Sequence, residues 1–163
     1  MTVSEWMQRI ERGGVPVSLW EYSMSVEAPS ARAKRNWEYA RRAGLKTVAK
    51  VQVNATWEMA VVPSIPVLDL VARHATNLLE QDVDGVMLSW SLGGYPSENL
   101  KLFQSIRQGD VAEDVVSEFA RNEYGDKVGG IITGMYTGGT LNAAALQAIF
   151  KIPGETFVLI NSY

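Results

Sequence analysis

The segment that most constrains the fold of this chain is VDGVMLSWSLGGYP, residues 83–96, because it joins a short apolar run to a polar, glycine-containing loop. Two earlier segments follow the same plan, VPVSLWEYSMS at residues 15–25 and TVAKVQVNATWEM at residues 47–59. Buried strands that open into polar loops build the sites of α/β proteins at the carboxyl ends of parallel strands. The three segments therefore predict three parallel strands with polar carboxyl ends.

Helical patterns alternate with these strands. Capping serines, an early proline and stop glycines predict helices at about 30–44, 66–81 and 97–108, with further helices at 4–12 and 110–125. Residues 15–108 thus contain three consecutive βα units, which favours an α/β fold with a parallel sheet and right-handed crossovers. Three units cannot close a barrel, and as an open sheet they would bury one face poorly, so we expect a partial βα barrel that belongs to a larger domain.

The charged residues are unevenly distributed along the chain. Residues 1–126 hold 13 of the 15 Lys and Arg and 17 of the 18 Asp and Glu. This shift predicts a boundary near Asp126, with the partial barrel at 1–126 and a Gly-rich apolar tail of different origin at 127–163. The tail has no run of the ~20 apolar residues that a membrane span needs. Glycine-interrupted apolar segments also occur in the broken helices of transporters, so membrane contact is expected only if the tail is a transmembrane segment.

Several classes of site are excluded by composition and spacing. The chain has no cysteine and only one histidine, His74, which excludes thiolate and multi-histidine metal sites. Gly93-Gly94 lacks the G-x-G-x-x-G spacing, so we expect no nucleotide site and no cofactor. The net charge of −3 predicts no nucleic-acid footprint, and the basic run at 32–42 is interpreted as a solvated helix face. The start of the chain has no apolar signal-peptide segment, which leaves a cytoplasmic or an exported location open.

Two glutamates are the candidate catalytic residues. Glu21 follows Trp20 and Glu58 follows Trp57, each at or just past the end of an expected strand. A carboxyl group beside an indole ring has a partly apolar environment, which favours its protonated form and suits a general acid. Two such groups at the rim of a parallel sheet could flank a glycosidic bond. The alternative is that each glutamate is an ordinary solvated loop residue.

Aromatic side chains near the same strand ends form a second candidate group, Trp20, Trp57, Trp90 and Tyr95, of which the last three are the candidate sugar platform. Aromatic faces can stack on the C–H faces of sugar rings, so these are candidate substrate-binding residues; the alternative is that they plug the core. Smaller polar groups in the same places could hydrogen-bond sugar hydroxyls or orient the carboxylates, with turn and capping chemistry as the alternative: Gln52, Asn54 and Ser89.

The segments TVAKVQVNATWEM and VDGVMLSWSLGGYPSENL, with the IPV-led helix between them, resemble the C-terminal part of bacterial glycoside-hydrolase-like proteins. The resemblance covers about residues 15–125 and implies a TIM-type βα barrel with a carbohydrate substrate at the strand ends. In hexosaminidase-type barrels of this style the acidic residues lie on a middle strand, which implies a catalytic acid upstream of residue 1. Residues 128–163, with TGGTLN, resemble a segment of an uncharacterised family of polytopic bacterial inner-membrane proteins. Together the two resemblances imply a chimeric or truncated chain.

Three functions are compatible with these observations. The leading hypothesis is a glycoside hydrolase fragment in which Glu21 and Glu58 act as acid/base or sugar-orienting groups. The second is a non-catalytic carbohydrate-binding module that uses the same aromatic side chains but lacks two carboxyl groups within ~5–10 Å. The third is a non-functional fragment joined to a membrane-protein segment. The first hypothesis requires the three strand ends to line one concave face.

Overall fold

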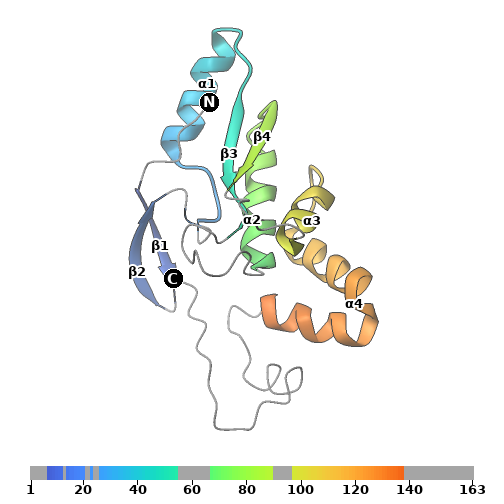
Figure 1. Cartoon of the computed structure of the whole chain (residues 1–163). Helices are drawn as coiled ribbons and strands as arrows, with labels where there is room; N and C mark the ends of the chain where they lie inside the picture. The colour runs from blue at the N-terminus through green and yellow to red at the C-terminus, as the bar shows by residue number, and fades with distance from the viewer. Residues whose placement is uncertain are drawn as a thin grey trace.

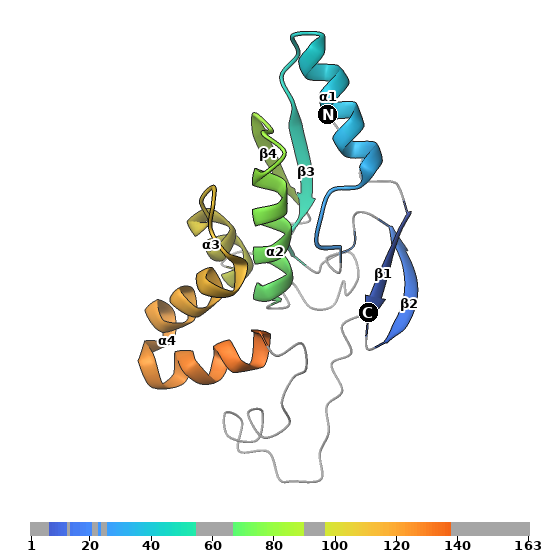
Figure 2. The same ribbon diagram turned by 180° about the vertical axis from the view of Figure 1, so that it is seen from behind.

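The computed structural model describes residues 7–12, 14–20, 23, 26–54, 67–89 and 97–137 (Figure 1). In chain order the elements are β1 Met7–Arg12, β2 Val15–Trp20, α1 Ala31–Arg42, β3 Val48–Gln52, α2 Leu68–Leu79, β4 Gly85–Ser89, α3 Glu98–Ser105 and α4 Ala112–Thr137. In both views α1 lies beside β3, and α2 lies between the β1–β2 hairpin and the two helices α3 and α4 (Figures 1 and 2).

The predicted parallel sheet of three strands, and with it the partial TIM-type barrel, is wrong. The structure has two separate sheets: β1 pairs antiparallel with β2, and β3 pairs parallel with β4. The segment at 7–12, expected to be helical, is a strand whose register with β2 runs from Met7↔Trp20 to Arg12↔Val15. Gly14, with φ of 79°, supplies the left-handed backbone that tight hairpin turns use.

Loop closure explains why β2 takes this partner. The connection between β1 and β2 is only two residues long, whereas some 27 residues separate β2 from β3. A short connection with a suitable turn residue closes at a lower entropic cost than a long one. The ladder of β2 is therefore satisfied locally, and β2 does not join the parallel pair.

The β3–β4 pair is covered by helices on one face only. Ala49 and Val51, which alternate along β3, pack in one cluster with Ala33 and Trp37 of α1 and with Leu78 of α2. On the other face, Val48 and Met87 remain 36% and 44% exposed. In a closed barrel that second face would be the packed interior. The exposure of these two side chains is thus a further sign that the described strands form no barrel.

A second apolar cluster joins α2, α3 and α4. It contains one face each of α2, α3 and α4: Leu68, Val71, Ala72, Ala75, Leu102, Ile106, Ala112, Val116 and Phe119. Leu68 and Leu102 are completely buried, and burying one such leucine stabilises a fold by about 1.5–3 kcal/mol. This cluster therefore holds α2 in place, and α2 connects the two parallel strands.

The expected helix starts of α1 and α3 are confirmed. The Ser30 hydroxyl accepts a hydrogen bond from the amide of Ala33 at 3.1 Å, and the Ser97 hydroxyl accepts one from Leu100 at 3.4 Å. Such N-caps satisfy amide groups that have no partner within the helix. β3, α2 and β4 form one parallel βαβ unit, so this part of the predicted alternation is present in the structure.

Asp84 ties together the amino ends of β3 and β4. Its carboxylate accepts from Lys46 Nζ at 2.6 Å, from the Thr47 amide at 2.8 Å and from the Thr47 hydroxyl at 3.1 Å. These bonds to the charged form, chiefly that from Lys46, lower the pKa of Asp84 to about 2. Because the amino ends are joined in this way, the strands run in register to their other ends, where Gln52 is paired with Ser89.

Helix α4 is bent at Gly125, which has φ of 75° and ψ of 164° inside an otherwise helical run. A Cβ atom added at Gly129 would lie 2.7 Å from the carbonyl oxygen of Ala120, so the backbones on the two sides of the bend are in contact. The composition break that the sequence shows near Asp126 lies one residue from this bend. Within the described ranges, no helix has the length and apolar character to cross a membrane.

Candidate functional site

The candidate site lies where β3 and β4 end. The parallel register pairs Gln52 with Ser89, the last residues of the two strands, so their carboxyl ends are neighbours. The end of β2 does not join them, because β2 belongs to the antiparallel hairpin. Trp20, at that end, is 47% exposed. Two of the three strand ends expected to meet are therefore adjacent in one sheet, and the third belongs to the other sheet.

Three buried polar side chains join the chain segments around this edge. We call Asn54, Ser97 and Asn99 the polar clamp; they are 0%, 3% and 0% exposed. The Ser97 hydroxyl donates to Asn54 Oδ1 at 2.7 Å. The Asn99 side chain donates from Nδ2 to the carbonyl oxygen of Val53 at 2.8 Å and accepts at Oδ1 from the amide of Val67 at 3.1 Å.

The polar clamp holds the ends of the two segments that carry most of the predicted site. Val53 and Asn54 precede residues 55–66, and Val67 follows them, so Asn99 bonds on both sides of that segment. Ser97, which bonds Asn54, directly follows residues 90–96. Buried polar groups that are hydrogen-bonded in this way hold one backbone arrangement, since breaking any bond leaves a buried group unsatisfied. Both segments therefore start and finish at the carboxyl edge of β3 and β4.

Not every predicted site residue lies in the described part of the chain. Both candidate catalytic carboxylates and the three candidate rings of the sugar platform lie outside the described residues: Glu21, Glu58, Trp57, Trp90 and Tyr95. Ser89 is the last residue of β4, but its side chain is not described. Gln52 is the last residue of β3 and is buried, with 9% exposed. Asn54 is fully buried within the polar clamp, which makes it a positioning residue of the edge.

The sequence reasoning missed Asn99. Its two partners, Val53 and Val67, lie 46 and 32 residues away, so no local pattern could indicate them. Ser97 was predicted only as a helix cap, a role that it does fill. A weak signal was available in the sequence, because an asparagine in the first turn of a helix that follows a polar loop is placed to bond nearby backbone.

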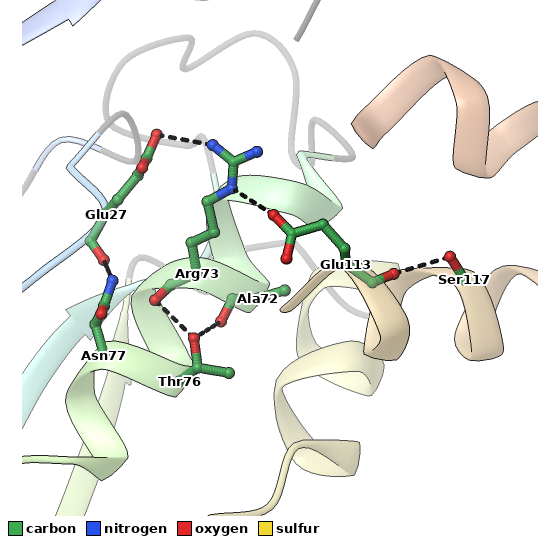
Figure 3. Close-up of polar contacts among 7 residues, drawn as sticks. All are labelled: Glu27, Ala72, Arg73, Thr76, Asn77, Glu113 and Ser117. Carbon is green, nitrogen blue, oxygen red and sulfur yellow. Dashed lines mark hydrogen bonds and ion pairs between the residues drawn. The ribbon is translucent and has the colours of Figure 1, made fainter. Parts of the chain in front are cut away.

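A second polar cluster surrounds Arg73 of α2 (Figure 3). Its guanidinium lies between two carboxylates, at 3.6 Å from Glu27 and 3.7 Å from Glu113 of α4. Asn77 Nδ2 donates to the carbonyl oxygen of Glu27 at 2.8 Å, which attaches the segment before α1 to α2. His74 adds a 2.6 Å bond to the carbonyl oxygen of Val26, and its Nδ1 carries the proton because a carbonyl only accepts.

This polar cluster links secondary-structure elements, and its side chains do not indicate a catalytic reaction. Asp69, Arg73 and Glu113 lie around a shallow surface depression together with Ala112 and Val116. Burial raises the pKa of Asp69, an effect that Arg73 partly offsets. Across the described ranges, no group of three or more His, Asp or Glu side chains could hold a metal ion. The cluster therefore connects the segment before α1 with α2 and α4.

Comparison with protein-family models, with curated protein sequences and with solved structures finds no match to this chain.

Proposed function

We propose that this chain binds a carbohydrate at the carboxyl edge of β3 and β4, through the aromatic rings of Trp57, Trp90 and Tyr95. The observation that supports the proposal is the pairing of Gln52 with Ser89, together with the polar clamp at the same edge. Trp57 belongs to the segment that follows β3, and Trp90 and Tyr95 belong to the segment that follows β4. The polar clamp bonds residues on both sides of the first segment, and the second lies between Ser89 of β4 and Ser97 of the clamp.

Binding without hydrolysis is the version of this proposal that the strand pairing favours. Hydrolysis of a glycoside by paired carboxyl groups needs them about 5–10 Å apart on either side of the bond. Glu58 belongs to the segment between β3 and α2, whereas Glu21 follows β2 in the other sheet. The pairing that was expected to bring these two glutamates to one sheet edge is not made.

A titration of tryptophan fluorescence with cello-, xylo-, malto- and chito-oligosaccharides tests the proposal. At least one series should bind, and Trp57→Ala and Trp90→Ala should each weaken binding five- to thirtyfold, the equivalent of about 1–2 kcal/mol for a lost ring contact. Trp20→Ala is the matched control, because Trp20 is an exposed tryptophan at a strand end of the other sheet. Equal effects of all three substitutions, or no binding to any series, would contradict the proposal.

The same samples separate binding from hydrolysis. Release of reducing sugar from the oligosaccharide that binds should remain at the level of a protein-free control. If sugar is released and Glu58→Gln stops the release while binding is kept, the chain is a hydrolase and the non-catalytic version of the proposal is wrong.

A further inference from the structure

The outer face of α1 carries a row of arginines around one exposed aromatic ring. Arg32, Arg35, Tyr39 and Arg42 are spaced i, i+3, i+7 and i+10, which places them on one side of a helix. Trp37, on the opposite side, is 4% exposed and packs against β3, whereas Tyr39 is 57% exposed. We call these four residues the arginine stripe. At 1.5 Å per residue the stripe is about 15 Å long.

The net charge of the whole chain does not show that α1 is strongly positive. The twelve residues of α1 include five basic side chains and one acidic side chain, Glu38, which gives a net charge of +4. The other 151 residues therefore carry −7, because the whole chain carries −3. A net charge near zero does not exclude a polyanion site when the positive charges gather on one helix. The expectation that no nucleic acid binds considers only the net charge of the whole chain and does not consider where the positive charges lie.

The arginine stripe is accessible in the fold. In both views α1 forms the margin of the molecule next to β3, and no other labelled helix or strand lies on its far side (Figures 1 and 2). All three arginines are exposed. Arg42 forms an ion pair with Glu38 one turn away on α1, and an exposed pair of this kind contributes only about 0.3–0.5 kcal/mol. It can therefore be exchanged for a phosphate contact at little cost.

The chemistry of the stripe favours a single strand of nucleic acid. Arginine presents a planar fork that matches phosphate oxygens, and an exposed aromatic ring offers a stacking surface for one unpaired base. A membrane surface fits less well, because basic helices bind membranes by inserting an apolar face. The apolar face of α1, with Ala33 and Trp37, is already buried in the core.

We propose that α1 binds single-stranded nucleic acid, with Arg32, Arg35 and Arg42 on phosphates and Tyr39 stacked on a base. Three phosphate contacts on a single strand give a slope of about −2 in a plot of log K against log salt concentration. Binding is consequently strong only at low salt, and the negative charge of the other 151 residues reduces it further. This site is separate from the carbohydrate site proposed above, since the arginine stripe lies on the side of α1 opposite Trp37, which packs against β3.

Fluorescence anisotropy with labelled (dT)20 and (U)20 at 20 to 200 mM salt tests this proposal. The wild-type chain should bind with the slope given above, and Arg35→Gln should reduce the slope by about 0.7 and weaken binding severalfold. Arg121→Gln is the matched control, since Arg121 is an exposed arginine of α4, and it should change neither quantity. Tyr39→Ala should weaken binding roughly tenfold without changing the slope, because stacking releases no counterion.

The following results would contradict the proposal that α1 binds single-stranded nucleic acid. The proposal is wrong if neither strand binds at 20 mM salt, if the Arg35 and Arg121 variants behave alike, or if only vesicles with anionic lipid bind. It is also wrong if low salt produces oligomers and no complex with nucleic acid. That outcome would indicate contact with a second copy, through the acidic surface of α4 that carries Glu113, Asp114 and Glu118. Unchanged circular dichroism and Tm of the variants show that any loss of binding is not a loss of fold.

Discussion

Replacing Asn99 by leucine should destabilise the protein strongly, because Asn99 is the residue of the polar clamp that bonds two backbone groups. The side chain is completely buried, and its hydrogen bonds include one to the carbonyl oxygen of Val53 and one from the amide of Val67. Leucine has a similar volume, so the substitution removes the bonds without opening a large cavity. The buried carbonyl oxygen of Val53 and the partly buried amide of Val67 then lose this partner, at about 1–3 kcal/mol each.

The expected loss in the free energy of unfolding is thus about 2–6 kcal/mol. Domains of this size are stable by about 5–15 kcal/mol, so the loss is a substantial fraction of the total. Urea titration followed by far-ultraviolet circular dichroism measures it, with an unchanged m value as the sign that two-state unfolding is retained. Asn36→Leu is the control, since Asn36 is exposed on α1, and its effect should stay within about 0.5 kcal/mol.

Asn99→Asp provides a second test of the same contact through pH. An aspartate keeps an acceptor for the Val67 amide but, when charged, has no donor for the Val53 carbonyl oxygen. Burial raises the folded-state pKa of such a carboxyl above the unfolded value of about 3.9. The destabilisation relative to wild type is therefore absent or small below about pH 4 and grows as pH rises through the folded-state pKa. If Asn99→Leu loses less than about 1 kcal/mol and Asn99→Asp shows no such pH dependence, the clamp does not hold this edge.

Two further predictions concern the amino ends of the parallel strands and the bend in α4. Asp84→Asn should lower the Tm at pH 7. Because the pKa of Asp84 is lowered to about 2, the difference in Tm from wild type should shrink as pH falls from about 4 and vanish near pH 2. Thermal unfolding at several pH values measures this difference. A difference that persists at pH 2 would mean that the charge of Asp84 is not the cause. Gly129→Ala should destabilise by about 1–3 kcal/mol in urea titration, because its Cβ would lie 2.7 Å from the Ala120 backbone, whereas Gly130→Ala, with nothing within 4 Å, should stabilise by up to about 1 kcal/mol. Equal effects at the two glycines would contradict the close approach across the bend.

Local chemistry made several elements predictable. The start of α1 at Ser30 and the start of α3 at Ser97 depend on hydrogen bonds to amides three residues away, so the sequence alone indicates them. The amphipathic pattern of α2 and the apolar runs of β3 and β4 are local in the same sense. Because β3, α2 and β4 follow one another closely, the neighbouring carboxyl ends at Gln52 and Ser89 could also be predicted.

Segment 7–12 and strand β2 show where local reasoning fails. MQRIER has apolar residues that suit one helical face, yet it forms β1, because β2 lies two residues away and the ladder supplies partners for its backbone. A propensity that favours a helix weakly is overridden when a strand partner is adjacent. The expected strand at Val15–Trp20 is confirmed, but its expected place in the parallel sheet is wrong, since its apolar run does not specify which edge it pairs with.

By itself, then, the sequence determined the helix starts and the charge gathered on α1, because each depends on residues a few positions apart. It also indicated the βαβ unit, because β3, α2 and β4 follow one another closely along the chain. Only the tertiary structure decided that the barrel is absent, that β2 leaves the parallel sheet, and that Asn99 bonds both sides of residues 55–66. It also left the ring of Tyr39 exposed on α1, whereas the solvated position of the basic side chains was already indicated by the sequence. The physical reason is common to all four: hydrogen-bond partners and buried contacts between distant residues are chosen by the assembled fold, and no local pattern encodes them.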